Sequence, residues 1–460
     1  MVNIGKIFRF LFYSYVVAFS VRQDNKRHVK NIPEIFANVT EGYEFSIPAL
    51  QQEIFPEFLE KGIRSLFVRK RITAYGEDKQ VRIALRYLNL LEDEKRYLRE
   101  YSDFMARKLS VTKADRERAK VILEAFGLPV NEHTNPAEPE EDPLGNGFYR
   151  RWVRTWSRIK KLELAAETII SRQIEEALYE ERTRSPWPGA KSIFPPVGFK
   201  FYPRPPKLLV VSPKGGVKRI ADLFVSPYIT SADIIKLESR VELIKDGENL
   251  YSAYISDIGG CASVYPAIIT PTTAKSCFNV IVHEWTHGFV MFTPVYTAKD
   301  KTFLSAMNET VSEYMGEEIS NKIWEKYYEP YLDSKYGKIP EEEKGSALDG
   351  WEKECEEIMK ETYYLMQSCL DEGRFKEAEE HMREGFNLLK HKGYPVRKMN
   401  SAYFAFLGQY AAGPAFRGAN GGVGNLLHLL RQNTSLRDFL YTATSCTSLQ
   451  DLERAVARNR

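Results

Sequence analysis

Two histidines and a glutamate form a tight cluster in the middle of the sequence. His283 and His287 are four residues apart, and Glu284 directly follows the first of them. On an α-helix, positions i and i+4 lie on the same face, so both imidazoles can reach one metal ion. Glu284 then lies beside that face, where a carboxylate can take a proton from a metal-activated water. The spacing therefore predicts a metal-binding helix suited to zinc-assisted hydrolysis.

The residues around this cluster strengthen the prediction. A match to the pattern H-E-x-x-H arises by accident in about one chain of this length in a hundred, so the pattern alone is only suggestive. From 278 to 292, however, Glu284 is the only charged residue, which is typical of a buried helix. Two histidines and a carboxylate are costly to bury without a partner, and a metal ion provides one.

A zinc hydrolase needs three protein ligands and an open position for water. A third histidine at the spacing H-E-x-x-H-x-x-G-x-x-H is absent, because Met291, Phe292 and Thr293 occupy that region. After an intervening turn, the sequence instead gives Glu309 and Glu313, which are again four residues apart.

The segments 283–287 (HEWTH) and 308–313 (NETVSE) together resemble the gluzincins, the thermolysin-like clan of zinc metallopeptidases. Members of this clan pair H-E-x-x-H on one helix with N-E-x-x-S-[DE] on the next. The 21 residues between His287 and Glu309 are close to the spacing in the clan, although the resemblance covers only about two helices. It implies that one zinc ion assists the hydrolysis of peptide bonds in a peptide or protein substrate.

The resemblance also implies a role for each polar residue of the two segments. Glu284 is the general base that activates water. Glu313 accepts the second ring N–H of His283, and Asn308 belongs to the same supporting set around the metal ligands. The three metal ligands are then His283, His287 and Glu309.

A β-segment before the metal-binding helix has the position at which gluzincins pair an edge strand with an extended peptide. Two adjacent glycines there let the backbone approach closely, although a hairpin turn is the commoner meaning of such a pair. The G-x-M-E-N run that the aminopeptidase branch uses to bind a free amine is absent, which favours an endopeptidase. The residues predicted to bind substrate are Gly260, Cys261 and Ala262.

Amide hydrolysis also needs a donor for the negative charge that develops on the carbonyl oxygen. Gluzincins commonly supply a tyrosine or a histidine from outside the two motif helices. Tyr403, in an uncharged stretch of the C-terminal region, is the leading candidate for this catalytic role, with Tyr410 and Tyr296 as alternatives. The chain has 26 tyrosines, and each one singly is more often a packing residue.

The surrounding sequence predicts an α+β fold that is mostly helical. Helical periodicity dominates both ends of the chain, whereas short apolar runs between them indicate a small β-sheet. A proline-rich stretch separates the first helices from a zincin-like catalytic core. The predicted parts are 1–22, a signal or membrane anchor; 23–184, a helical N-terminal region; 185–206, the connector; 207–330, the catalytic core; and 331–460, a helical C-terminal lobe.

The overall composition limits the classes of partner. The chain has 65 basic and 62 acidic residues, so no net field favours a nucleic acid as partner. The five cysteines are odd in number and scattered, and they predict neither disulfides nor a second metal site. A hydrophobic content of 43% in 460 residues is sufficient for large cores. The oligomeric state has no signal in the sequence.

The N-terminus has three interpretations. Residues 10–21 form an uncharged apolar run after Lys6 and Arg9, as in a signal peptide or a short anchor. The cations between Arg22 and Lys30 disfavour passage of this end across a membrane, and a buried helix explains the run equally well. Membrane association or export is expected, with a cytoplasmic location as the alternative.

A second class of function stays open at this point. A membrane-associated binding or assembly protein could retain a zinc helix and catalyse nothing. A purely structural zinc site is disfavoured, because structural sites are usually closed by four protein ligands and Glu284 would have no role.

Overall fold

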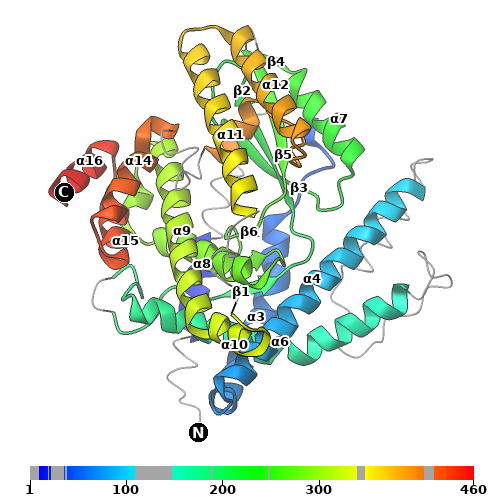
Figure 1. Ribbon diagram of the computed structural model, residues 1–460, viewed down its shortest axis with the longest axis vertical. Coiled ribbons are helices and arrows are strands. Elements are labelled where there is room, and N and C mark those ends of the chain that lie inside the picture. Colours follow the sequence, from blue (N-terminus) through cyan, green and yellow to red (C-terminus); the bar gives the residue numbers. More distant parts are fainter. Residues whose placement is uncertain are drawn as a thin grey trace.

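The structure is a computed structural model that describes residues 10–18, 20–21, 36, 39–108, 148–187, 190–246, 249–338, 348–408 and 419–459. This part of the chain is mostly helical and contains two small β-sheets (Figure 1). The predicted fold class, a mostly helical α+β protein, is confirmed at this level.

Long helices form the N-terminal region, as the sequence predicts. The side chain of Ser46 caps the first of them by accepting the backbone N–H of Ala49 at 3.2 Å. On the second, buried apolar residues recur every three or four positions, as in Val81, Ala84 and Leu88, and this face packs on the third helix. The three helices are α3 (Ile47–Thr73), α4 (Glu77–Lys108) and α6 (Phe148–Glu180).

In the described part of the chain, seven short strands follow and form two sheets, where the sequence indicated one. In the four-stranded sheet, of order β3-β2-β5-β4, all neighbours are antiparallel. In the three-stranded sheet, of order β1-β7-β6, β7 pairs with β1 in parallel and with β6 antiparallel. The strands are β1 (Phe199–Phe201), β2 (Lys207–Pro213), β3 (Ala221–Val225), β4 (Lys245–Asp246), β5 (Asn249–Ser256), β6 (Gly260–Cys261) and β7 (Ala267–Ile269).

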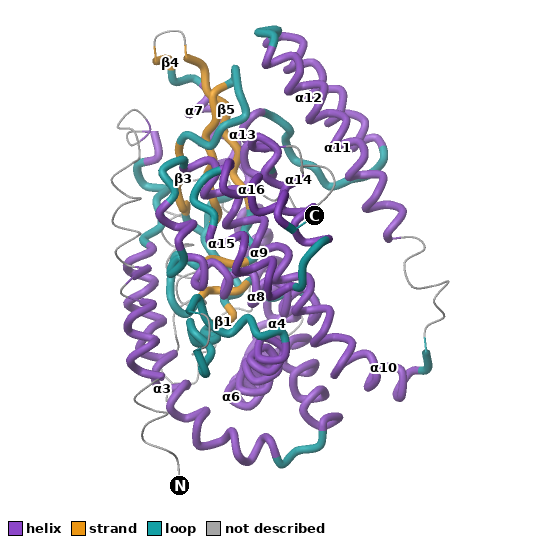
Figure 2. The backbone as a smooth tube through the Cα atoms, turned by 90° about the vertical axis from the view of Figure 1, so that its left-hand side faces the viewer, coloured by secondary structure: helices purple, strands orange, loops and turns teal. Residues whose placement is uncertain are grey.

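The four-stranded sheet is covered by helices on both faces. Successive residues of a strand point to opposite faces, so Leu209 packs toward α7 (Ser231–Glu242), while Tyr254 of β5 packs on Tyr403 of α13 (Ser401–Leu407). Figure 2 shows two further helices side by side on the opposite side of the molecule from α3. They are α11 (Leu348–Asp371) and α12 (Phe375–His391).

The two motif segments lie on consecutive helices, α8 (Ala274–Val290) and α9 (Lys301–Ile323), joined by the short helix η1 (Pro294–Thr297). The π-helical turn η2 (Trp324–Tyr328) and α10 (Glu329–Tyr336) extend α9. Three C-terminal helices follow in the described chain; the first two pack against α9, and the third packs against the first. They are α14 (Ala419–Gln432), α15 (Leu436–Ser445) and α16 (Leu449–Arg458).

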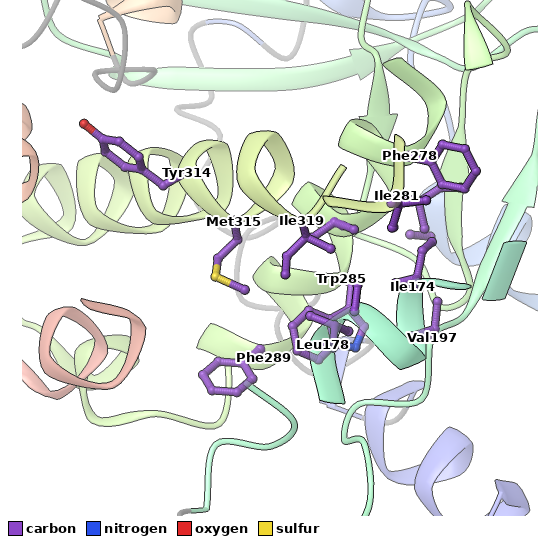
Figure 3. Close-up of a cluster of buried hydrophobic side chains, with 14 of the residues drawn as sticks. Ile174, Leu178, Val197, Phe278, Ile281, Trp285, Phe289, Tyr314, Met315 and Ile319 are labelled. Carbon is purple, nitrogen blue, oxygen red and sulfur yellow. The ribbon is translucent and has the colours of Figure 1, made fainter. Parts of the chain in front are cut away.

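One hydrophobic core joins the N-terminal helices to the motif helices. Figure 3 shows Leu178 of α6 close to Trp285 of α8, with Ile319 of α9 nearby, and all three are buried. The indole N–H of Trp285 donates to the carbonyl of Pro195 at 2.8 Å, which ties the proline-rich connector to the same core. The described residues on the two sides of the predicted connector 185–206 therefore share one core.

The N-terminal run packs as a buried helical segment over the described residues 10–18 and 20–21. Val17 is 1% exposed and lies in a cluster with Phe194 and Tyr265. Among the described residues, no helix combines the length and the apolar character that crossing a membrane requires. The packing corresponds to the buried-helix interpretation of this run.

Replacing Val17 by aspartate tests whether this segment belongs to the folded body. Burying an unpaired carboxylate there should lower the free energy of unfolding by about 3 kcal/mol or more. Phe12, 60% exposed on the same segment, provides the matched control, and Phe12→Asp should change stability by about 1 kcal/mol at most. Urea unfolding of both variants measures the difference. Equal unfolding midpoints would show that the segment is not part of the core.

Candidate metal centre

Helix α8 presents its two histidines to one point. The Nε2 atoms of His283 and His287 are 3.0 Å apart, and their rings are perpendicular, with centroids 4.6 Å apart. The opposite face of the helix is anchored by Phe278, Ile281 and Phe289, each no more than 2% exposed. The predicted i, i+4 arrangement is therefore present, and the apolar anchors fix the direction in which the imidazoles point.

Glu309 of α9 completes a triangle of donor atoms. Its Oε2 atom lies 3.4 Å from Nε2 of His283 and 3.6 Å from Nε2 of His287. The point equidistant from the three atoms is about 1.9 Å from each, close to the usual zinc–ligand distances of about 2.0–2.2 Å. The same Oε2 atom is buried and makes no hydrogen bond within the described chain. Two imidazole nitrogens and one orphaned carboxylate oxygen are a donor set that fits zinc.

A glycine allows α9 to approach α8 closely enough to bring Glu309 to the histidines. A Cβ atom on Gly316 would lie 2.9 Å from the backbone oxygen of Asn279 and 2.8 Å from its side-chain oxygen. Because real Cβ atoms do not come this close to other atoms, a larger residue would push the helices apart. Glu309 lies about two turns before this point on α9, so its position depends on the same helix contact.

Two carboxylates face the imidazoles, and their charge states differ. Ligand atoms of Glu284 and the two histidines lie within 4.8 Å of one another, so Glu284 also belongs to the centre. Burial raises the pKa of Glu284 to about 7, and the carboxylate of Glu309 adds to this rise. For Glu309, burial acts in the same direction, but His287 and His283 outweigh it and lower its pKa to about 2. Glu309 is therefore held as an anion, and Glu284 can exchange a proton near neutral pH.

The three residues predicted to bind substrate lie beside Glu284. A Cβ atom on Gly260 would lie 2.5 Å from its Oε1 atom, so the absence of a side chain at this position makes room for the carboxylate. The backbone N–H of Ala262 donates a hydrogen bond to Glu284, and burial raises the pKa of the neighbouring Cys261 thiol to about 12. The structure places strand β6 against Glu284, and the binding of substrate there stays a prediction.

Ser312 supports the centre in a way that the sequence analysis did not assign. Its hydroxyl lies 3.2 Å from Nδ1 of His287, the ring nitrogen that does not face Glu309. Such a partner fixes the orientation of a metal-binding imidazole. Ser312 stands inside the segment NETVSE, three residues after Glu309, so helical spacing alone could have indicated it.

The two other supporting residues are on α9 as well. Glu313 is half-buried one turn after Glu309, and its predicted hydrogen bond from His283 stays a prediction. The side-chain oxygen of Asn308 is buried and accepts no hydrogen bond within the described chain.

The three tyrosines that were candidates for the oxyanion donor lie in different parts of the chain. Tyr403 lies in the cluster of α11, α12 and α13, with its hydroxyl 3.8 Å from the sulfur of Met359. These contacts are those of a packing residue. Packing is the alternative role that the large number of tyrosines in the chain suggested. Tyr296 is in η1, and Tyr410 lies outside the described residues. The structure therefore gives no support to Tyr403 as the oxyanion donor.

Comparison with protein families, with curated proteins and with solved structures finds no match to this chain. The resemblance to the gluzincins therefore depends on the two sequence segments and on the geometry of the metal centre. Membership of that clan is a proposal.

Gly260 and its neighbour Gly259 form a matched pair for testing the contact with Glu284. In Gly260→Ala the new methyl group meets the carboxylate, so we expect a loss of about 1–3 kcal/mol in the free energy of unfolding. In Gly259→Ala the methyl group meets only Val280, at an ordinary 3.6 Å, and we expect no loss. Urea unfolding of both variants measures the difference, and an equal effect would contradict the close approach.

Proposed function

We propose that this chain is a zinc-dependent peptidase of the gluzincin type, with a zincin-like catalytic core. The observation that carries the proposal is the position of the buried Oε2 atom of Glu309, within 3.6 Å of both histidine Nε2 atoms and without a hydrogen bond in the described chain. A cation at this point would neutralise the buried carboxylate and join the three donor atoms, and the donor set suits zinc.

A zinc ion held by His283, His287 and Glu309 would supply a Lewis acid that acidifies a water molecule and polarises a carbonyl group. The side chains of the protein would then carry out the proton transfers. Glu284 would take the proton of the attacking water and give it to the leaving amine. Because its pKa is raised to about 7 by burial, both transfers are accessible near neutral pH.

The edge strand β6 supports peptides as the substrate class. Within the described chain, β6 pairs with β7 on one side only, and Gly260 lies directly against Glu284. An extended peptide added to its outer edge would have its scissile bond near the base. An internal stretch of peptide suits such an edge, and this agrees with the endopeptidase that the missing G-x-M-E-N run favours.

Two isosteric variants separate the base from the metal ligand. Glu284→Gln should keep about one zinc ion per chain while hydrolysis falls by about 10²–10⁴-fold, because only proton transfer is lost. Glu309→Gln removes the same charge but should lose zinc as well. Metal analysis and cleavage of an unstructured peptide library, with and without a chelator, measure both quantities.

The outcomes of this experiment distinguish the candidate functions. Wild-type protein that is purified without chelators and holds no zinc would contradict the metal centre itself. Zinc in the wild-type protein without chelator-sensitive cleavage would favour the alternative, a catalytically silent binding or assembly protein.

Ser312→Ala tests the hydrogen bond to His287. Loss of the hydroxyl frees the imidazole to rotate, so the affinity for zinc should fall by about 10–100-fold while the fold is kept. Ser305 lies seven residues earlier on α9, and Ser305→Ala should leave the affinity unchanged. Competition with a chromogenic chelator measures both affinities. Equal values for the two variants would exclude an orienting role for Ser312.

A further inference from the structure

A second pocket lies between α3, α6 and β1, and it has a volume of about 110 Å³. None of the described residues that line it belongs to the metal centre. The volume corresponds to about four water molecules at liquid density. A small organic molecule of about five non-hydrogen atoms therefore fits.

One part of the wall is aromatic and aliphatic. Phe58 and Leu66 of α3 line it together with Phe199 of β1. Phe10, on the N-terminal segment, also lines the pocket, and its ring centroid is 5.5 Å from that of Phe58. These side chains offer an apolar surface on which a short hydrocarbon chain can be removed from water.

The other part of the wall carries a cluster of charges. The ammonium group of Lys61 lies 3.0 Å from a carboxylate oxygen of Glu57, 2.6 Å from Glu163 and 3.6 Å from Glu167. Lys200 also pairs with Glu57. Three carboxylates thus converge on one buried ammonium group. Two of them have a second cation close by, since Glu57 pairs with Lys200 and Glu163 pairs with Lys160.

Among these three carboxylates, Glu167 has the fewest cations close by. Its Oε1 atom accepts a hydrogen bond from the hydroxyl of Tyr87 at 2.9 Å, whereas its Oε2 atom pairs with the ammonium group of Lys61 at the longer distance of 3.6 Å. Burial raises the pKa of Glu167 to about 7, with Glu163 adding to the rise. A cationic donor that reached Oε2 would satisfy this oxygen and stabilise the charged form.

We propose that the pocket binds a small primary ammonium compound, whose ammonium group donates to Oε2 of Glu167 and whose hydrocarbon chain contacts Phe58 and Phe199. An ammonium group at hydrogen-bond distance would give Oε2 of Glu167 a closer donor than Lys61, which is 3.6 Å away, and the apolar wall favours a ligand that also carries a hydrocarbon chain. Binding here is independent of the metal centre and of its proposed activity.

Titration of the full-length protein with n-butylammonium tests this assignment, with isothermal calorimetry as the measurement. We expect one saturable site per chain with a Kd of about 1 mM. The neutral isostere n-butanol should bind at least about tenfold more weakly, because it lacks the charge-assisted hydrogen bond. Absence of saturable binding up to about 50 mM, or equal binding of butanol, would overturn the proposal.

Two matched variants locate the site. Glu167→Gln should weaken butylammonium binding by about tenfold or more. Glu163→Gln removes the same charge beside Lys61 but does not alter the lining, so its effect should stay within about threefold. Glu284→Gln at the metal centre should bind butylammonium as the wild type does. Equal losses of binding in Glu167→Gln and Glu163→Gln would show that the amine responds only to the net charge near Lys61, which would overturn the proposal. Loss of binding in Glu284→Gln would show that the amine binds at the metal centre, which would overturn it as well.

Discussion

The burial of one carboxylate between two imidazoles is the constraint on which the centre of this molecule depends. Glu309 can reach the histidines only because α9 packs tightly on α8, and the glycine at 316 allows that approach. The cost of placing these polar groups in an apolar helix pair is offset when a cation joins them. The large core beneath α8, shared with α6, keeps the three donor atoms from relaxing apart.

Local spacing explains which parts of the site could be predicted from the sequence. His283 and His287 are related by one helical turn, so their convergence follows from helix geometry and needs no knowledge of the fold. The pairing with Glu309 came from the resemblance of two segments to a known clan, and the structure brings its Oε2 atom within 3.6 Å of both imidazoles. The region 331–460 was predicted to be helical, and α11 (Leu348–Asp371) within it is a long helix, since its apolar periodicity is long and regular.

Tertiary packing decided the features that the sequence did not predict. Nothing local indicates that Gly260 must lack a side chain to make room for Glu284. The proline-rich connector suggested a boundary between domains, yet Trp285 binds the carbonyl of Pro195 and one core spans both sides. Tyr403 was chosen for its uncharged surroundings, and those surroundings form a separate apolar cluster against the four-stranded sheet. In each case an apolar or small residue acquires its role from a partner distant in sequence.

The two glutamates of the centre show how one environment produces two functions. Both are buried, and burial raises the pKa of any carboxyl group. Glu309 lies against both imidazoles, which lower its pKa by more than burial raises it. For Glu284, His287 and a backbone N–H lower the pKa, but burial and the carboxylate of Glu309 raise it by more. The more tightly Glu309 is held as an anion, the more it disfavours a second negative charge at Glu284. An anionic carboxylate and a carboxyl group that exchanges a proton can therefore occupy one site, because the charge of Glu309 helps to raise the pKa of Glu284 towards neutral.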